Sequence, residues 1–287
     1  MSVLVFIDHA DGHIKKSSLE ALSYGSAVAA QTGTSAEAVL LGTVIEDLST
    51  LGKYGAKKIH QLKNEALNNL DAQAYTKIIA EVVNTTGAKL VIFSNNVSGK
   101  AIAPRLSARL KAGLVAGAVA LPDTSNGFVV KKNVFSGKAF ANISLGSDIK
   151  IISLNPNSYQ IKTGEGTAEL VNLNINIDPF KVKTISVSKS SGEVPLTEAE
   201  IVVSGGRGLK GPENWGMIEE LAKLLHAATA CSRPVADAHW RPHNEHVGQT
   251  GIAIAPNLYI AIGISGAIQH LAGVNRSKKE MISISRF

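Results

Sequence analysis

Residues 200–210 read EIVVSGGRGLK, and this stretch indicates the fold class of the second half of the chain. Its apolar start, Glu200–Val203, predicts a buried strand that runs directly into the glycine-rich turn Ser204–Gly208. The spacing beyond the turn predicts a helix from Asn214 to Leu225. A strand that passes through a glycine-rich turn into a helix is how a parallel α/β sheet presents backbone amides to a phosphate or dinucleotide.

The residue types in this turn suit an anionic ligand. Its glycines allow the backbone to approach a ligand closely, and Arg207 adds a guanidinium that can bind a pyrophosphate. The spacing differs from the G-x-G-x-x-G fingerprint of NAD-binding proteins. Taken alone, such a turn is more often a plain loop or part of a salt bridge.

Further segments of this kind follow in the same half of the chain. Cys231–Pro234 comes after an alanine-rich stretch that predicts a strand, so Arg233 should lie near a strand's carboxyl end. Val247–Gly251 is a small polar loop that offers backbone amides, an amide side chain and a hydroxyl. Leu258–Ile262 predicts a buried strand that passes through a second glycine turn into a helix near Ala267–His270. Several loops with groups that can bind a ligand each follow an apolar run, so we interpret them as parts of a binding site rather than as unrelated turns.

The first half of the chain alternates apolar runs with segments of helical periodicity, which is typical of a parallel sheet covered by helices. The predicted strands are Val3–Ile7, Ala38–Leu41, Lys58–Gln61 and Leu90–Phe93, and the predicted helices are Ser17–Thr32, Ala72–Thr85 and Lys100–Leu110. From Gly113 to Ser188 the pattern changes to short alternating strands, which predict an antiparallel section at the sheet edge. These strands are expected at 128–132, 139–144, 150–153 and 170–175.

A segment rich in Ser and Lys, Ser186–Pro195, has the composition of a linker. We therefore expect an α/β protein of two domains, each with a mostly parallel sheet flanked by helices. The predicted boundaries are 1–188 for the first domain, 189–198 for the linker and 199–287 for the second domain. The first domain contains no ligand loop of comparable quality, so its predicted role is scaffolding and partner contact.

Composition narrows the function classes. The chain has 287 residues, of which 45% are hydrophobic, a globular profile. The net charge of +6 comes from scattered lysines without interleaved aromatics, so we expect no nucleic-acid partner. A single cysteine excludes an internal disulfide. The apolar start, Val3–Ile7, is too short for a signal peptide, and we see no transit peptide or membrane-spanning segment, so we expect a cytoplasmic bacterial protein without membrane insertion.

Two histidine patterns have alternative interpretations. His239, His243 and His246 have a spacing that fits a metal site on one helix face. Pro242 interrupts that face, so we interpret them as loop residues and predict no metal. His270 by itself would more often be a core or capping histidine than a ligand-binding one.

Three strings carry a specific resemblance: SGGRGLK at 204–210, VGQTG at 247–251 and LYIAIGISGAIQHLAG at 258–273. They resemble the hallmark segments of electron transfer flavoprotein alpha subunits. The first half adds GKAIAPRLSARL at 99–110 and a similar opening strand and helix. The resemblance implies that FAD binds in the second domain, which would be a Rossmann-like FAD-binding domain.

The resemblance also implies roles for individual residues. Arg207 would approach the pyrophosphate, Arg233 would lie over or beside the isoalloxazine, Thr250 near its N5 and His270 near its O2. One-electron reduction places negative charge on the N1 and O2 side, where a guanidinium and an imidazole favour it. The implied cofactor-binding residues are Arg207, Ser232, Arg233, Val247, Gly248, Gln249, Thr250, Ser265, Gly266, Ala267, Ile268, Gln269 and His270.

The resemblance ends near Gly273. Family members continue with a strand ending in Asn and an Asp-containing segment, for which the residues up to Phe287 offer no counterparts. We therefore expect a C-terminally truncated member whose second domain lacks its last elements, with Met281–Ile284 as an edge strand and with reduced FAD affinity.

The function implied by the resemblance is that of a one-electron carrier rather than a catalyst of substrate chemistry. It would form a heterodimer with a beta subunit and move electrons from acyl-CoA dehydrogenases of fatty acid beta-oxidation to a quinone oxidoreductase. One alternative is a truncated subunit that folds or pairs with its beta partner but binds no FAD. A weaker alternative is an NAD(P)-dependent oxidoreductase, which would require the missing G-x-G-x-x-G turn.

Overall fold

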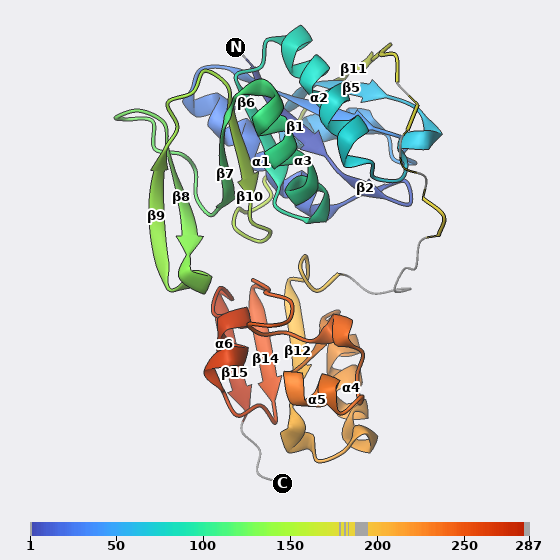
Figure 1. The fold of residues 1–287 in the computed structure, drawn as a ribbon, viewed down its shortest axis with the longest axis vertical. Helices are drawn as coiled ribbons and strands as arrows, with labels where there is room; N and C mark the ends of the chain where they lie inside the picture. The colour runs from blue at the N-terminus through green and yellow to red at the C-terminus, as the bar shows by residue number, and fades with distance from the viewer. Residues whose placement is uncertain (1, 178, 181, 183, 187–194, 284–287) are drawn as a thin grey trace. The chain divides into compact units, whose positions relative to one another are not determined.

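The computed structural model describes residues 2–177, 179–180, 182, 184–186 and 195–283. These residues form two compact units, one made of residues 2–133 and 140–186 and the other of residues 134–139 and 195–283 (Figure 1). Residues 189–194 of the predicted linker lie outside the described residues, so the predicted domain boundaries stay predictions.

The first unit is built on one sheet in the order β11-β5-β4-β1-β6-β10-β7-β8-β9. The bounds are β1 (Ser2–Ile7), β4 (Ser35–Leu41), β5 (Ala56–Leu62), β6 (Leu90–Ser94), β7 (Gly113–Ala118), β8 (Val129–Val134), β9 (Ala139–Ser144), β10 (Lys150–Leu154) and β11 (Glu169–Asn172). The central strand β1 is buried along its whole length, because helices cover both faces of the sheet.

Alternate residues of β1 enter two separate cores. Val5 packs with Leu22 of helix α1 (Lys16–Gln31) on one face. Phe6 packs with Ile79 of α2 (Ala72–Thr86) on the other face, where α3 (Val97–Leu110) also lies (Figure 1). The alternation follows from the two-residue period of a strand, which sends neighbouring side chains to opposite faces.

The predicted antiparallel section is wrong for two of its strands. β10 pairs parallel with both β6 and β7 inside the sheet, and β11 pairs parallel with β5. β7 and β8 pair antiparallel, with Ala118 opposite Lys132. The buried run Ile151–Leu154 of β10 is typical of a strand covered on both faces, and its insertion between β6 and β7 depends on contacts far apart in the sequence.

The start of α3 also differs from the prediction. The helix begins at Val97, three residues before the predicted Lys100, and Asn96 caps it by accepting a hydrogen bond from the Gly99 N–H at 3.0 Å. The sequence Val97-Ser98-Gly99 has weak helix propensity, and the side-chain cap compensates for this weakness.

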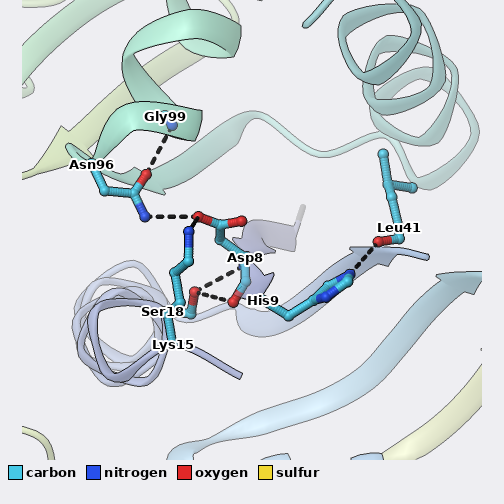
Figure 2. A network of polar contacts seen from close by, with 7 residues as sticks. All are labelled: Asp8, His9, Lys15, Ser18, Leu41, Asn96 and Gly99. Carbon is cyan, nitrogen blue, oxygen red and sulfur yellow. Dashed lines mark hydrogen bonds and ion pairs between the residues drawn. The ribbon is translucent and has the colours of Figure 1, made fainter. Parts of the chain in front are cut away.

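A polar network joins the ends of β1 and β6 (Figure 2). Oδ2 of the buried Asp8 accepts hydrogen bonds from Lys15 Nζ at 2.7 Å and from Asn96 Nδ2 at 2.9 Å. Ser18 Oγ accepts from the Asp8 N–H and donates to its carbonyl oxygen. The chain order reverses between β1 and β6, which is where open α/β sheets bind ligands. Here the polar groups at that position bind one another.

The second unit contains a parallel sheet in the order β13-β12-β14-β15. Its elements are β12 (Ile201–Gly205), α4 (Gly216–Leu224), β13 (Ala228–Cys231), α5 (Arg233–Asp237), β14 (Leu258–Ile262), α6 (Ile268–Val274) and β15 (Lys279–Ser283). The predicted edge strand therefore exists as β15, although Ile284 lies outside the described residues. Each face of the sheet carries its own apolar core, so the predicted fold class of parallel sheets flanked by helices is confirmed.

Short elements complete the described chain. The strands β2 (His9–Ala10) and β3 (His13–Ile14) form an antiparallel pair. The 3-10 helices are η1 (Leu48–Tyr54), η2 (Glu65–Leu67), η3 (Phe135–Gly137), η4 (Arg207–Leu209), η5 (Pro212–Asn214) and η6 (His243–Glu245). Among the described residues, no helix combines the length and apolar character that crossing a membrane requires.

Candidate functional site

A pocket of about 680 Å³ lies at the carboxyl edge of the second unit's sheet. It is lined by Arg207, Gly208, Ser232, Arg233, Pro234, His246, Val247, Gly248, Gln249, Thr250, Gly263, Ile264, Ser265, Ala267, Gln269 and His270. Of the predicted cofactor-binding residues, Gly266 and Ile268 are outside this lining, and the structure brings all the others together. Residues from the ends of β12, β13 and β14 meet here because parallel strands end at the same edge.

The two glycine turns of the pocket contact each other through their backbones. The Gly206 N–H donates to the Ile262 carbonyl oxygen at 2.8 Å, and the Gly208 N–H donates to the Gly263 carbonyl oxygen at 2.9 Å. A Cβ atom on Gly206 would lie 2.2 Å from the Gly263 carbonyl oxygen, which is an impossible contact. The glycines are therefore required for the approach of the two turns.

The segment after β13 places a serine and an arginine beside the pocket. Ser232 is buried, and its N–H donates to the Gly205 carbonyl oxygen at 3.1 Å, which ties this segment to the end of β12. Arg233 begins α5 and has an exposed side chain whose Nε lies 3.2 Å from Asp237 Oδ2. The guanidinium thus stands at the pocket with a carboxylate partner one helical turn away.

The loop Val247–Gly251 is fixed against α6. The Gln249 N–H donates to the Gln269 carbonyl oxygen at 2.7 Å, and the Val247 N–H donates to the Cys231 carbonyl oxygen at 3.0 Å. A Cβ atom on Gly273 would lie 2.5 Å from the backbone of Gly248, so glycine permits the loop to contact the helix directly.

His270 is buried in the pocket wall. Its Nε2 lies 2.6 Å from the hydroxyl oxygen of Tyr259, and its Nδ1 is buried without a hydrogen-bond partner among the described residues. Burial and, to a smaller extent, the nearby His246 together lower the pKa of His270 to about 4. The ring is therefore neutral at pH 7, with one nitrogen held by a tyrosine and hydrogen-bonding capacity left at the other.

Sequence reasoning missed five lining residues: Gly208, Pro234, His246, Gly263 and Ile264. Gly208, Pro234 and Ile264 are immediate neighbours of predicted residues, and Gly263 lies two residues before Ser265 in the same turn, which was the available signal. His246 was interpreted as a loop residue with His239 and His243. His246 lies directly before the Val247–Gly251 loop, and this position could have identified it as a pocket residue, unlike His239 and His243. In the described part of the chain, no group of three or more His, Cys, Asp or Glu side chains is arranged to hold a metal.

The pocket carries positive charge. Two arginines and two histidines line it, and none of the described lining residues is acidic. Its orphaned His270 nitrogen and its converging glycine turns match a ligand with anionic groups and ring atoms that accept or donate hydrogen bonds. Together with the parallel sheet, these features are typical of nucleotide-binding α/β proteins.

Comparison with known proteins gives the family. Residues 3–177 match the family model described as an electron transfer flavoprotein domain, and residues 195–275 match the model described as an electron transfer flavoprotein FAD-binding domain. The chain belongs to the electron transfer flavoprotein alpha-subunit family. The predicted resemblance is thereby confirmed, and FAD is the cofactor of the matched domain.

Individual relatives agree with this assignment. The electron transfer flavoprotein subunit alpha of Syntrophomonas wolfei is 34% identical over 278 residues, which cover 96% of this chain and 86% of the relative. The subunit of the same name from Bacillus subtilis is 32% identical, with the same coverage of both chains. The protein FixB of Clostridium saccharobutylicum is 32% identical over 96% of this chain and 84% of its own length.

Proposed function

We propose that this chain is an alpha subunit that binds FAD in the pocket of its second unit and carries single electrons. The observation that carries the proposal is the combination of positive lining charge with the unpartnered Nδ1 of the buried His270. His270 lines the pocket, so a ligand bound there can supply the hydrogen-bond partner that its Nδ1 lacks among the described residues.

The lining residues divide by the chemistry that they offer. Arg207 and the amides of the two glycine turns suit phosphate oxygens, and Arg233 adds a second fixed positive charge. Ser232, Gln249 and Thr250 offer neutral hydrogen-bonding groups for a sugar-alcohol chain or a ring edge. Bound FAD supplies reversible one-electron redox chemistry. The chain's own contribution is to hold the cofactor, to offset negative charge with the guanidinium of Arg233, and to offer a hydrogen bond from the neutral ring of His270.

The wider role rests on the family. We propose that the chain pairs with a beta subunit as a heterodimer, because its relatives are named as alpha subunits. We further propose that it accepts electrons from acyl-CoA dehydrogenases and delivers them to a quinone oxidoreductase, as a carrier rather than as an enzyme of substrate chemistry. These partners come from the resemblance alone.

The test is to coproduce the full chain with its beta subunit and to measure bound FAD by chromatography after acid release. We expect about one FAD per heterodimer and a flavin spectrum that changes in two resolved one-electron stages during a dithionite titration. A folded heterodimer that stays free of flavin after incubation with excess FAD would overturn the proposal and support the flavin-free alternative. Specific binding of NAD(P)H instead would support an NAD(P)-dependent oxidoreductase.

A further inference from the structure

His246 is held in place by its backbone on both sides. Its N–H donates to the His243 carbonyl oxygen at 3.1 Å, and its carbonyl oxygen accepts from the Ile252 N–H at 2.8 Å. It also forms a parallel bridge with Cys231, at the end of β13. These bonds fix the backbone from which the imidazole enters the pocket wall.

The imidazole of His246 lies in the pocket wall, where no described residue gives it a hydrogen bond. The residue is 7% exposed and lines the pocket, and its ring makes no hydrogen bond or ion pair with any described residue. A Cβ atom on Gly248 would lie 3.4 Å from His246 Nε2 and 3.7 Å from the His270 Cα atom, so the two histidines flank this glycine. A neutral imidazole has one donor and one acceptor, and among the described residues both are left free for a ligand in the pocket.

The groups around His246 keep it neutral in the free protein. Burial lowers its pKa, the charge of Arg233 on α5 lowers it further, and His243 acts in the same direction. Asp237 raises the pKa of His246 by more than His243 lowers it, and the neutral His270 stands on the other side of Gly248. Negative charge added to the pocket would offset Arg233 and favour the protonated ring.

We propose that His246 is a second histidine that contacts the bound cofactor and gains a proton when negative charge enters the pocket. The inference rests on the proposed FAD site. When FAD binds, its phosphates bring negative charge, and the imidazole becomes partly protonated by taking up a fraction of one proton from solvent. When one electron then arrives from the donor, further proton uptake by the same ring leaves the net charge of the pocket closer to constant.

The first test measures protons directly. Apoprotein in complex with its beta subunit is titrated with FAD by calorimetry in two buffers of different ionisation enthalpy, at pH 6.5 and 7.5. We expect net proton uptake in the wild type and a tighter Kd at the lower pH, by about 2–5-fold, because binding and protonation are linked. Wild-type binding without proton uptake at both pH values would overturn the inference even if no variant folds.

Two variants assign the proton to His246. His246→Gln keeps hydrogen-bonding capacity but cannot titrate, so it should bind FAD with reduced proton uptake and a flatter pH dependence. His226→Gln is the matched control, because His226 is exposed, lies outside the pocket lining and does not act on the pKa of His246, and it should behave as the wild type does. Equal uptake in His246→Gln and the wild type would refute the assignment.

A second readout uses the first reduction potential of the flavin. Full coupling of one proton to one electron corresponds to a tenfold change in the equilibrium constant per pH unit, or 59 mV. We expect partial coupling in the wild type and less in His246→Gln. If the wild type binds no FAD at all, the proposed function fails. If FAD binds but the variant keeps the wild-type slope, only the inference about His246 fails.

Discussion

The hydroxyl oxygen of Tyr259 in β14 lies 2.6 Å from Nε2 of His270 in α6, and both residues are buried. The strand that forms the middle of the second sheet thereby fixes the ring of a pocket histidine. Their ring centroids are 5.9 Å apart, so the two side chains also pack together. A hydrogen bond of this kind sets which nitrogen is available to a ligand.

Removing the Tyr259 hydroxyl should weaken the second unit. Tyr259→Phe leaves His270 Nε2 buried without a partner, so we expect the free energy of unfolding to fall by about 1–2 kcal/mol. Both tryptophans, Trp215 and Trp240, belong to this unit, so urea unfolding followed by tryptophan fluorescence reports on it. Tyr54→Phe, whose hydroxyl makes no hydrogen bond within the described residues, is the control and should leave this transition unchanged. Equal transitions in both variants would contradict the prediction.

The stability of the second unit should depend on pH through His270. Its pKa is about 4 in the folded protein against 6.5 for the free side chain, so the unfolded chain binds more protons between these values. The free energy of unfolding therefore falls as pH drops through this window, by about 2 kcal/mol between pH 7.5 and 5. His270→Gln removes this contribution, and carboxylates contribute equally to both proteins. Parallel stability curves for wild type and variant would show that His270 does not titrate as described.

The contact between the glycine turns should be intolerant of a methyl group. In Gly206→Ala the new Cβ would collide with the Gly263 carbonyl oxygen, so we expect a loss of about 1–3 kcal/mol and weaker FAD binding. Gly216→Ala is the matched control, because nothing lies within 4 Å of its Cβ position and it is in helix α4. That variant should gain about 0.5–1 kcal/mol. Urea unfolding followed by tryptophan fluorescence shows whether each variant has a lower or a higher free energy of unfolding than the wild type.

Arg207 should contribute to cofactor affinity through its charge. Loss of a charge-assisted hydrogen bond in Arg207→Ala should weaken FAD binding by about 10–100-fold, measured from flavin fluorescence. Lys223→Ala removes the same charge from an exposed position on α4 that is outside the pocket lining, and it should change the Kd little. The difference between the variants should shrink at high salt, because screening weakens exposed charges. A similar Kd for both variants at low salt would argue against a phosphate contact.

The Asp8 network should stabilise the first unit. Asp8→Ala leaves Lys15 Nζ and Asn96 Nδ2 without their shared acceptor, so we expect a loss of about 2–4 kcal/mol. Asp148→Ala breaks an ion pair with Lys89 at the surface and should cost less than about 1 kcal/mol. Hydrogen–deuterium exchange of β1, α1 and α3 measures both effects. Unchanged protection of these elements in Asp8→Ala would show that the network is dispensable.

Local sequence patterns were sufficient for most of the elements. The strand and turn at 200–208 and the strand at 258–262 were predicted because a buried run followed by glycines is encoded by neighbouring residues. The same signals predicted most of the pocket lining, because the ends of parallel strands share one edge. The placement of β10 between β6 and β7 was not predictable in this way, since its partners lie far away in the sequence.

The amino-acid sequence by itself determined the order of strands, glycine turns and helices, the family, and most of the residue types that line the pocket. Tertiary structure alone decided which side chains are buried and what they contact. The hydroxyl of Tyr259 contacts the ring of His270. His246 lies in the pocket wall, whereas the neighbouring histidines in the sequence are exposed. The physical reason is that burial and pKa depend on atoms brought together from separate elements, whereas a sequence pattern records only the preferences of neighbours along the chain.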